Sequence, residues 1–218
     1  MYSKYTYKVD AMKALQTAVS RSGYTRYISG VVSEKKLKSM LFKMEDRYQI
    51  NATKQQRWYA KKNGRANSKV ILLEEKDSDL VLFWLLVSDG EGVVTQMENL
   101  KDATSKTQRI ELTGYELVRV MKTSNHGNPT WTWRLKKETL ASFEKRIILA
   151  CRHKNSQKIA QCFYLLETMP VFSEMRQQSF SLFKLLKAEY QRSFRNEFEK
   201  SLFKNFYGRF KKATTKEI

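Results

Sequence analysis

The feature that most constrains the fold is the apolar run Leu80–Val87, which contains no charged or strongly polar side chain. It is far shorter than the ~20 residues that a membrane-spanning helix needs. A continuous apolar run of this length is typical of a strand at the centre of a sheet that is covered on both faces. Lys69–Glu74 precedes it across a short acidic turn, so the two segments together predict a β-hairpin.

The other elements follow from hydrophobic periodicity and from turn-forming residues. The expected helices are Val9–Ser22, Ser33–Tyr48, a short helix within Val93–Ala103, Lys137–Lys154, Ser156–Thr168 and Ser173–Lys212, and the further strands are Tyr24–Val32, Thr107–Leu112, Tyr115–Met121 and Thr130–Leu135. The pattern predicts an α+β fold, in which a mainly antiparallel sheet is packed by helices and an all-helical C-terminal third ends in a long helix. We expect an α+β core in residues 1–136 and a helical region in residues 137–218, packed on that core.

Charge is distributed unevenly along the chain, whose formal net charge is +19. Residues 1–70 carry sixteen Lys and Arg against four acids, residues 71–116 carry four against ten, and residues 117–218 carry twenty-one against eight. Basic flanks around an acidic centre would steer a polyanion to one side, and this favours nucleic acid as the partner. With no signal-peptide pattern and no lysine-bordered apolar helix for a lipid surface, we expect a soluble cytoplasmic protein without a membrane partner.

The densest positive segment is Thr53–Lys69, which we call the basic arm. It holds six cations and no acidic residue. Asn51 or Thr53 is suited to cap the start of a helix, and Asn63-Gly64 is suited to end it. On such a helix Trp58 lies among cations, an arrangement that suits phosphates and stacked bases. The alternative is a solvated basic helix with Trp58 turned into the core.

Within and beyond the basic arm, the candidate DNA contacts divide by chemistry. Ammonium groups neutralise phosphates, whereas guanidinium and amide groups read base edges. We expect phosphate contacts from Lys54, Lys61 and Lys62, base contacts from Gln55, Arg57, Arg65 or Asn67, further contacts from Trp58 and Lys69, and a second contact from the Thr123–Pro129 loop and its flanks through Lys122, Asn125 and Arg134.

Catalytic and metal-binding signals are few. The chain has only two histidines, His126 and His153, and its two cysteines, Cys151 and Cys162, form neither a disulfide framework nor a zinc motif. An acidic segment offers oxygen ligands for Mg²⁺ and is the basis of an alternative hypothesis, a metal-dependent nuclease. Its residues are Glu74, Glu75, Asp79, Asp89 and Glu91. Solvated turns need the same residues, so we expect no cofactor and no enzymatic activity.

The C-terminal helix carries an apolar stripe that drifts around its axis. The residues Phe183, Leu186, Tyr190, Phe194, Phe198 and Leu202 are spaced by three and then by four positions. Their average period exceeds 3.6, so one groove cannot cover the whole stripe. We therefore expect a second contact for this helix, such as a homodimer partner.

Several short blocks in order resemble a poorly characterised family of proteins carried by conjugative plasmids and integrative conjugative elements. The blocks are Gly23-Tyr24-Thr25-Arg26-Tyr27 with Gly30, Arg57 with Lys61-Lys62 and Gly64, Leu86-Val87-Ser88 with Gly90 and Gly92, Thr113-Gly114-Tyr115-Glu116-Leu117, Trp131-Thr132-Trp133-Arg134, and Met169-Pro170 with Phe172 and Arg176. The resemblance implies DNA handling on a mobile element, as in a MobI-type mobilisation auxiliary that acts with a relaxase at an origin of transfer. It assigns no catalytic residue.

The sequence thus predicts a non-catalytic, sequence-specific protein that binds double-stranded DNA, with a relaxase or another DNA-processing protein as its partner. The metal-dependent nuclease and an RNA-binding or replication-control protein remain as alternatives. The first alternative requires that Glu74, Glu75, Asp79 and Asp89 converge in space around a lysine.

Overall fold

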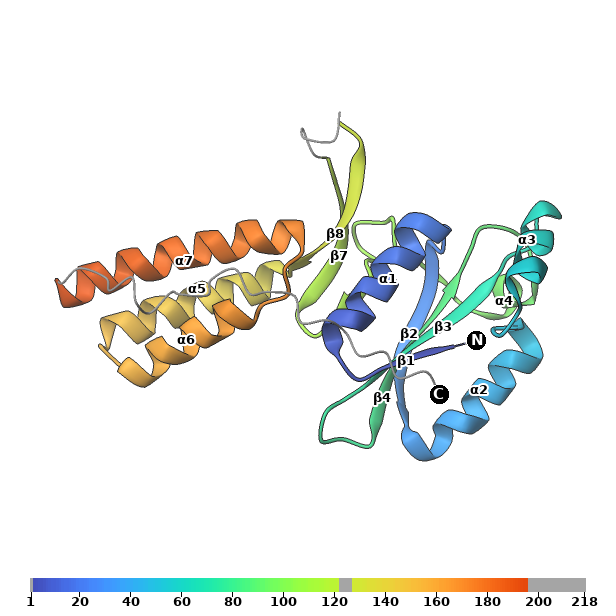
Figure 1. Cartoon of the computed structure of the whole chain (residues 1–218), viewed down its shortest axis with the longest axis horizontal. Helices are drawn as coiled ribbons and strands as arrows, with labels where there is room; N and C mark the ends of the chain where they lie inside the picture. The colour runs from blue at the N-terminus through green and yellow to red at the C-terminus, as the bar shows by residue number, and fades with distance from the viewer. Residues whose placement is uncertain (1, 122–126, 196–218) are drawn as a thin grey trace. The chain divides into compact units, whose positions relative to one another are not determined.

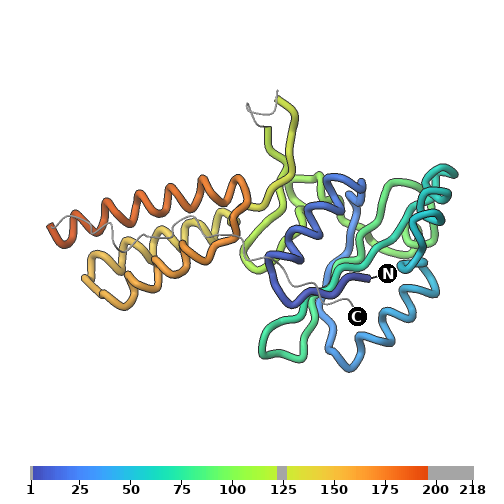
Figure 2. The backbone as a smooth tube through the Cα atoms, viewed as in Figure 1, coloured from blue at the N-terminus to red at the C-terminus, as the bar shows by residue number. Residues whose placement is uncertain are grey.

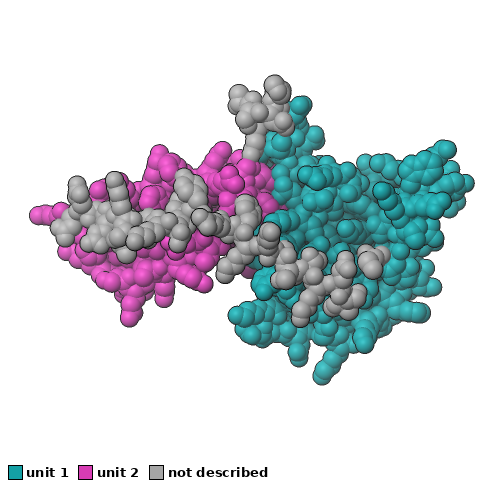
Figure 3. Space-filling model, in the orientation of Figure 1, with its two compact units in different colours: residues 1–110, 119–131, 214–218 teal, residues 111–118, 132–213 magenta. Residues whose placement is uncertain are grey.

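The computed structural model of the chain describes residues 2–121 and 127–195, which form two compact units. Among the described residues, unit 1 contains 2–110, 119–121 and 127–131, and unit 2 contains 111–118 and 132–195 (Figure 3). Unit 1 is built on a sheet and unit 2 mainly on helices, so the fold is α+β as predicted.

Unit 1 is organised on a five-stranded sheet with the strand order β1-β3-β4-β2-β5 (Figure 1). Its strands are β1 (Ser3–Tyr5), β2 (Arg26–Ser33), β3 (Ser68–Glu74), β4 (Leu80–Val87) and β5 (Lys101–Asp102). β4 pairs antiparallel with both β2 and β3, which confirms the predicted hairpin and the central position of the apolar run. β1 runs parallel to β3, so the sheet is mainly but not purely antiparallel. Figure 2 traces the backbone through these strands and the helices that follow.

The apolar run is not covered along its whole length, and here the prediction was wrong. Trp84–Val87 is buried, but Leu80 is 42% exposed and Leu82 and Phe83 are only partly buried. Leu80 begins the strand next to the exposed hairpin turn. Phe83 lies opposite Gly30, which has no side chain to cover it. A Cβ atom at Gly30 would come within 2.9 Å of the Phe83 ring, so the ring occupies the space that a side chain would fill.

Helices pack against the sheet of unit 1, and strand alternation separates their contacts. The helices are α1 (Lys8–Ser22), α2 (Glu34–Tyr48), α3 (Lys54–Lys62) and α4 (Val93–Met97). α2 places Leu37 and Leu41 in one buried cluster with Val70 and Leu72 of β3. Ile71, between these two residues, points to the opposite face because successive side chains of a strand alternate. α1 packs against β3 and β1, and its Met12, Leu15 and Val19 side chains are buried.

Unit 2 is the predicted helical region together with parts of a second sheet. Its helices are α5 (Lys137–Arg152), α6 (Ser156–Thr168) and α7 (Ser173–Phe194), and the second sheet consists of β6 (Glu111–Leu112), β7 (Tyr115–Met121) and β8 (Pro129–Leu135), of which β7 and β8 contribute residues to both units. α5 packs against α6 and α7, with Ile147, Met175 and Leu186 buried in the contacts. Within the part of the chain that is described, no helix combines the length and the apolarity needed to cross a membrane.

The long α7 confirms the expected final helix as far as residue 194. Arg195 follows it with a φ of 55° in the left-handed region, and residues 196–212 of the predicted helix lie outside the described residues. Leu186 is buried in unit 2, and the rings of Tyr190 and Phe194 stack with their centroids 4.5 Å apart. Phe198 and Leu202 of the drifting stripe also lie outside the described residues, so the homodimer through this helix stays a prediction.

Candidate nucleic-acid interface

The basic arm forms a short helix, α3, whose start is defined by a capping box. The Gln56 backbone N–H donates to Thr53 Oγ1 at 3.2 Å, and the Thr53 N–H donates to Gln56 Oε1 at 2.7 Å. Thr53, rather than Asn51, is therefore the N-cap, and two of the unpaired donors of the first turn are satisfied reciprocally. The helix ends at Asn63 and Gly64, where Gly64 has a φ of 68°, as the Asn-Gly pair predicted.

One side of α3 turns inward, and Arg57 occupies its centre. The guanidinium donates through Nη2 to the Ile50 carbonyl at 2.8 Å and through Nη1 to the Tyr24 hydroxyl at 3.4 Å. Its Nε is buried and has no hydrogen-bond partner among the described residues. Arg57 therefore holds α3 to the segment that follows α2. The prediction that it reads a base edge needs correction, because its donors face the protein.

Asn67 belongs to the same internal network. Its Nδ2 donates to the Arg57 carbonyl at 3.0 Å, and its backbone bonds on both sides with Ser88. Lys69 is partly buried, and this burial, followed by repulsion from the Arg57 charge, lowers the pKa of its ammonium. Asn67 thus supports α3, and the prediction that it contacts DNA directly is corrected in the same way. Lys69 lies partly buried in β3 rather than on the exposed surface of α3, so its predicted DNA contact is corrected as well.

The turn after α3 is held by close backbone contact with the turn after β4. The Ala66 N–H donates to the Glu91 carbonyl and the Glu91 N–H donates to the Gly64 carbonyl, both at 2.9 Å. Gly90 makes this approach possible. It has a φ of 128°, and a Cβ atom there would lie 2.6 Å from the Ala66 nitrogen. The exposed side chain of Arg65 is therefore carried by a turn whose backbone has little freedom.

The remaining side chains of α3 face outward, and the helix contains no buried residue. Trp58 is 62% exposed and Tyr59 is 64% exposed, so the alternative in which Trp58 enters the core is wrong. The Lys62 ammonium lies 5.3 Å from the centroid of the Trp58 ring, a cation–π contact. Lys54, Gln55 and Lys61 are also exposed, so α3 presents cations and aromatic rings together to solvent.

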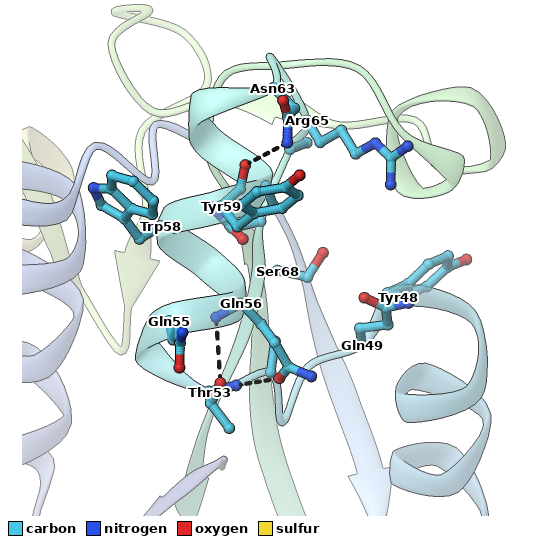
Figure 4. Close-up of a pocket in the computed structure, with 14 residues that line it drawn as sticks. Tyr48, Gln49, Thr53, Gln55, Gln56, Trp58, Tyr59, Asn63, Arg65 and Ser68 are labelled. Carbon is cyan, nitrogen blue, oxygen red and sulfur yellow. Dashed lines mark hydrogen bonds between the residues drawn. The ribbon is translucent and has the colours of Figure 1, made fainter.

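A pocket of about 580 Å³ lies between α3 and the end of α2. Figure 4 shows Tyr48 and Gln49 on one side of it and Gln56 and Tyr59 on the other, while Trp58 projects from a different side of the helix. Amides, hydroxyls and aromatic rings line the pocket, and Arg65 is the single lysine, arginine or acidic residue among the lining residues. Such a lining presents both donors and acceptors without repelling an anion.

The second predicted contact is only partly described. Lys122 and Asn125 lie outside the described residues. Arg134, in the unit 2 part of β8, donates through Nε to Glu116 Oε1 at 2.7 Å, and the Glu116 side chain is 13% exposed. The structure therefore places Arg134 in an ion pair with Glu116, and a guanidinium engaged by a carboxylate is less available to a base.

The acidic residues of the nuclease hypothesis do not converge. Glu74, Glu75 and Asp79 lie around the β3–β4 turn, whereas Asp89 and Glu91 follow the other end of β4. The eight residues of β4 separate the two groups by about 26 Å, at ~3.3 Å per residue. Glu74 pairs with Lys4 at 2.6 Å, and Asp89 lies 3.9 Å from Arg26. Within the described chain no group of three or more His, Cys, Asp or Glu residues is arranged to hold a metal ion.

The two cysteines are buried free thiols in unit 2. Burial is the largest cause that raises the pKa of Cys151, to about 11, and the nearby Cys162 and Glu189 add to the effect. Burial also raises the pKa of Cys162. At neutral pH both groups remain protonated thiols, which are poor nucleophiles and poor metal ligands.

Sequence reasoning missed Tyr59 and the end of α2 as parts of this surface. Tyr59 adjoins Trp58 inside an acid-free segment, and that position was a usable signal. Tyr48 and Gln49 belong to a different helix, and only the fold brings them to the pocket. Gln49 adopts a φ of 50° at the end of α2, a conformation that the sequence did not indicate.

Comparison of the chain with known proteins found no similar one: no protein-family model, no curated protein and no solved structure matches it. The chemistry of α3 and of the residues around it is therefore what supports a function.

Proposed function

We propose that the protein binds duplex DNA through α3 and the turn that follows it, as a non-catalytic, sequence-specific factor. The observation that carries this proposal is that α3 buries none of its residues while its orientation is determined by its capping box and by Arg57. A helix that exposes Trp58 and Tyr59 leaves apolar area in water, which is unfavourable unless a partner covers it. The exposed cations of α3 and the absence of acidic residues from the basic arm indicate an anionic partner.

The dimensions of α3 favour DNA over duplex RNA. An α-helix with its side chains is about 10–12 Å across, and the major groove of B-DNA, about 12 Å wide, admits a short helix such as the nine-residue α3. The major groove of an A-form RNA duplex is too narrow for side chains to read. An exposed basic helix therefore has a site in the major groove of DNA that the major groove of a regular RNA duplex does not offer.

Exposure divides the work among the side chains of this surface. Lys54, Lys61 and Lys62 would neutralise phosphates, because ammonium groups act as compact charges without a fixed orientation. Gln55 and Arg65 would read base edges, since amide and guanidinium groups make bidentate contacts there. Arg57 and Asn67, which the sequence also indicated, would instead hold α3 in position, and Lys69 lies partly buried in β3.

The first test measures salt dependence. Lys61→Ala and Lys62→Ala should each reduce the magnitude of the slope of log K against log salt by about 0.9. Each should also weaken binding to the specific site and to random DNA to a similar extent. Lys76→Ala is the matched control, because Lys76 is exposed in the β3–β4 turn at the far end of β3. Equal losses for all three variants would indicate a nonspecific effect of net charge and would reject α3 as the contact surface.

The second test identifies the ligand by selection from random DNA and random RNA pools at near-physiological salt. We expect enrichment of a duplex DNA site. Gln55→Ala or Arg65→Ala should reduce the binding free energy for that site by on the order of 1–3 kcal/mol and should affect binding to random DNA less. Enrichment of RNA alone would replace the proposal with an RNA-binding function. Equal binding of all DNA sequences would remove the sequence-specific part.

We also propose, from the resemblance to proteins of conjugative elements, that the site lies at an origin of transfer and that a relaxase is the protein partner. A recovered site that maps next to a relaxase nicking site, together with increased nicking when the protein is added, would support this role. A site far from any transfer origin would contradict it.

A further inference from the structure

The outer edge of β2 is open over most of its length. β5 pairs only with Arg26 and Tyr27, whereas β4 pairs with all of β2 on the other side. From Ile28 to Ser33 no other strand among the described residues lies along this edge. Unit 1 therefore exposes a strand edge that is long enough to pair with another strand.

Two hydrogen bonds show which residues of β2 point outward. The Thr25 carbonyl accepts from the Ala103 N–H at 2.8 Å, so Thr25 faces the β5 side. The Glu34 N–H donates to the Asp79 carbonyl at 2.8 Å, so Glu34 faces the β4 side. The direction of the backbone N–H and C=O groups alternates along a strand, so in β2 these groups of the odd-numbered residues point toward the outer edge. Ser29, Val31 and Ser33 present their N–H and C=O groups to this open edge.

This edge lacks the features that normally prevent strands from pairing. Tyr27–Ser33 contains no charged residue and no proline, and Val31 is 54% exposed. The opposite edge of the sheet is protected, because β1 has three residues and carries Lys4 at its centre. Natural proteins shield exposed edges with short strands, lysine, proline or bulges, so an unshielded edge indicates a pairing site.

We propose that β2 pairs antiparallel with β2 of a second copy, about a two-fold axis at Val31. The open residues run from Ser29 to Ser33, and Val31 is their midpoint. In this register Val31 faces the partner's Val31, and Ser29 faces the partner's Ser33. Each facing pair exchanges two backbone hydrogen bonds, so every open group of both copies finds a partner.

Self-complementarity is the reason to assign a second copy rather than another protein to this edge. A two-fold contact requires one surface to match itself, and small uncharged side chains face each other throughout this register. The net charge of +19 opposes association of two copies in general, but no charged residue lies within Tyr27–Ser33. The resulting sheet would continue through both copies, and two copies of α3 related by a two-fold axis would suit a palindromic site.

The first test measures mass by analytical ultracentrifugation without DNA, so that it does not depend on the proposed DNA binding. Wild-type protein should reach twice its 25.8 kDa with increasing concentration, and Val31→Lys should weaken the association at least tenfold. Val93→Lys is the matched control, because Val93 is 51% exposed in α4, and it should associate as wild type does. A wild-type protein that stays monomeric at all concentrations would overturn the proposal and leave the edge to a different strand.

The second test checks the register with cysteines. Facing residues of this type have Cα atoms about 5.5 Å apart, a distance that a disulfide spans. Val31→Cys should form a cross-linked dimer under mild oxidation, while Cys151 and Cys162 are buried and should not react. Ser29→Cys protein alone and Ser33→Cys protein alone should cross-link poorly. A mixture of the two variants should cross-link well, because position 29 of one copy faces position 33 of the other. Strong cross-linking of Ser29→Cys alone, or none of Val31→Cys, would reject this register.

Discussion

Arg57 provides the sharpest test of how the basic arm works, because its truncation should lower stability rather than DNA specificity. Its guanidinium donates to the Ile50 carbonyl at 2.8 Å and approaches the Tyr24 hydroxyl at 3.4 Å. Both acceptors belong to the protein, and both contacts hold α3 in place. Arg57→Ala should therefore release the helix from the segment that follows α2.

The expected magnitude follows from these contacts. A hydrogen bond from a charged donor contributes about 1.5–3 kcal/mol, and the longer contact to Tyr24 adds little. The buried Nε without a partner among the described residues reduces the net gain, because its desolvation is not compensated. We expect Arg57→Ala to lower the free energy of unfolding by about 1.5–2 kcal/mol, near the lower end of this range. Arg57→Lys should retain only part of this stabilisation, since an ammonium cannot reproduce the planar fork of a guanidinium.

Urea unfolding followed by circular dichroism measures the effect on stability. Titration of the selected DNA site without urea, where the variants are folded, measures affinity. Lys61→Ala is the control, because Lys61 is exposed and should change affinity but not stability. Asn67→Ala, which removes the bond to the Arg57 carbonyl, should cost about 0.5–1.5 kcal/mol and should couple to Arg57→Ala in a double-mutant cycle. If Arg57→Ala left the free energy of unfolding unchanged and selectively lowered the affinity for the preferred DNA site, this reasoning would be refuted. Arg57 would then again be assigned to base reading.

Three further predictions concern separate parts of the molecule. Gly90→Ala should displace the turn that carries Arg65, so a binding assay should show weaker DNA binding although no cation is removed. Gly23→Ala is the control: no atom lies within 4 Å of its added Cβ, and an unfolding assay should show a cost of only about 1 kcal/mol of backbone strain. Burial lowers the pKa of Lys8 to about 8, so between pH 8 and 10.5 the unfolded chain binds more protons than the folded chain, and the free energy of unfolding should rise with pH in that window. Lys8→Met should raise the free energy of unfolding at pH 7 and should flatten its rise with pH. The buried thiol of Cys151, with its pKa raised to about 11, should resist alkylation at pH 8 in native protein and react at the normal rate in urea, and fast native alkylation would contradict its burial.

Much of the fold was predictable because it depends on local pattern. The apolar run of β4, the acidic turn before it and the periodicity of α1, α2 and α5–α7 placed these elements close to their observed bounds. The cap at Thr53, one of the two candidates that the sequence offered, and the Asn63-Gly64 stop are also local, since the atoms involved lie within one helical turn. The sequence alone therefore determined the α+β class, the central strand and the existence of a basic helix without acids.

Tertiary structure decided how the residues of that helix are used. Arg57 and Lys61 have the same sign of charge and lie on neighbouring turns, yet one donates into the protein and the other faces solvent. The difference depends on where the Ile50 carbonyl and the Tyr24 hydroxyl lie, and sequence spacing does not encode that position. The acidic residues were likewise separated by the length of β4, and the open edge of β2 arose because β5 pairs with only two of its residues. Local pattern specifies which elements form, whereas the availability of a side chain or a strand edge depends on contacts between residues far apart in the chain.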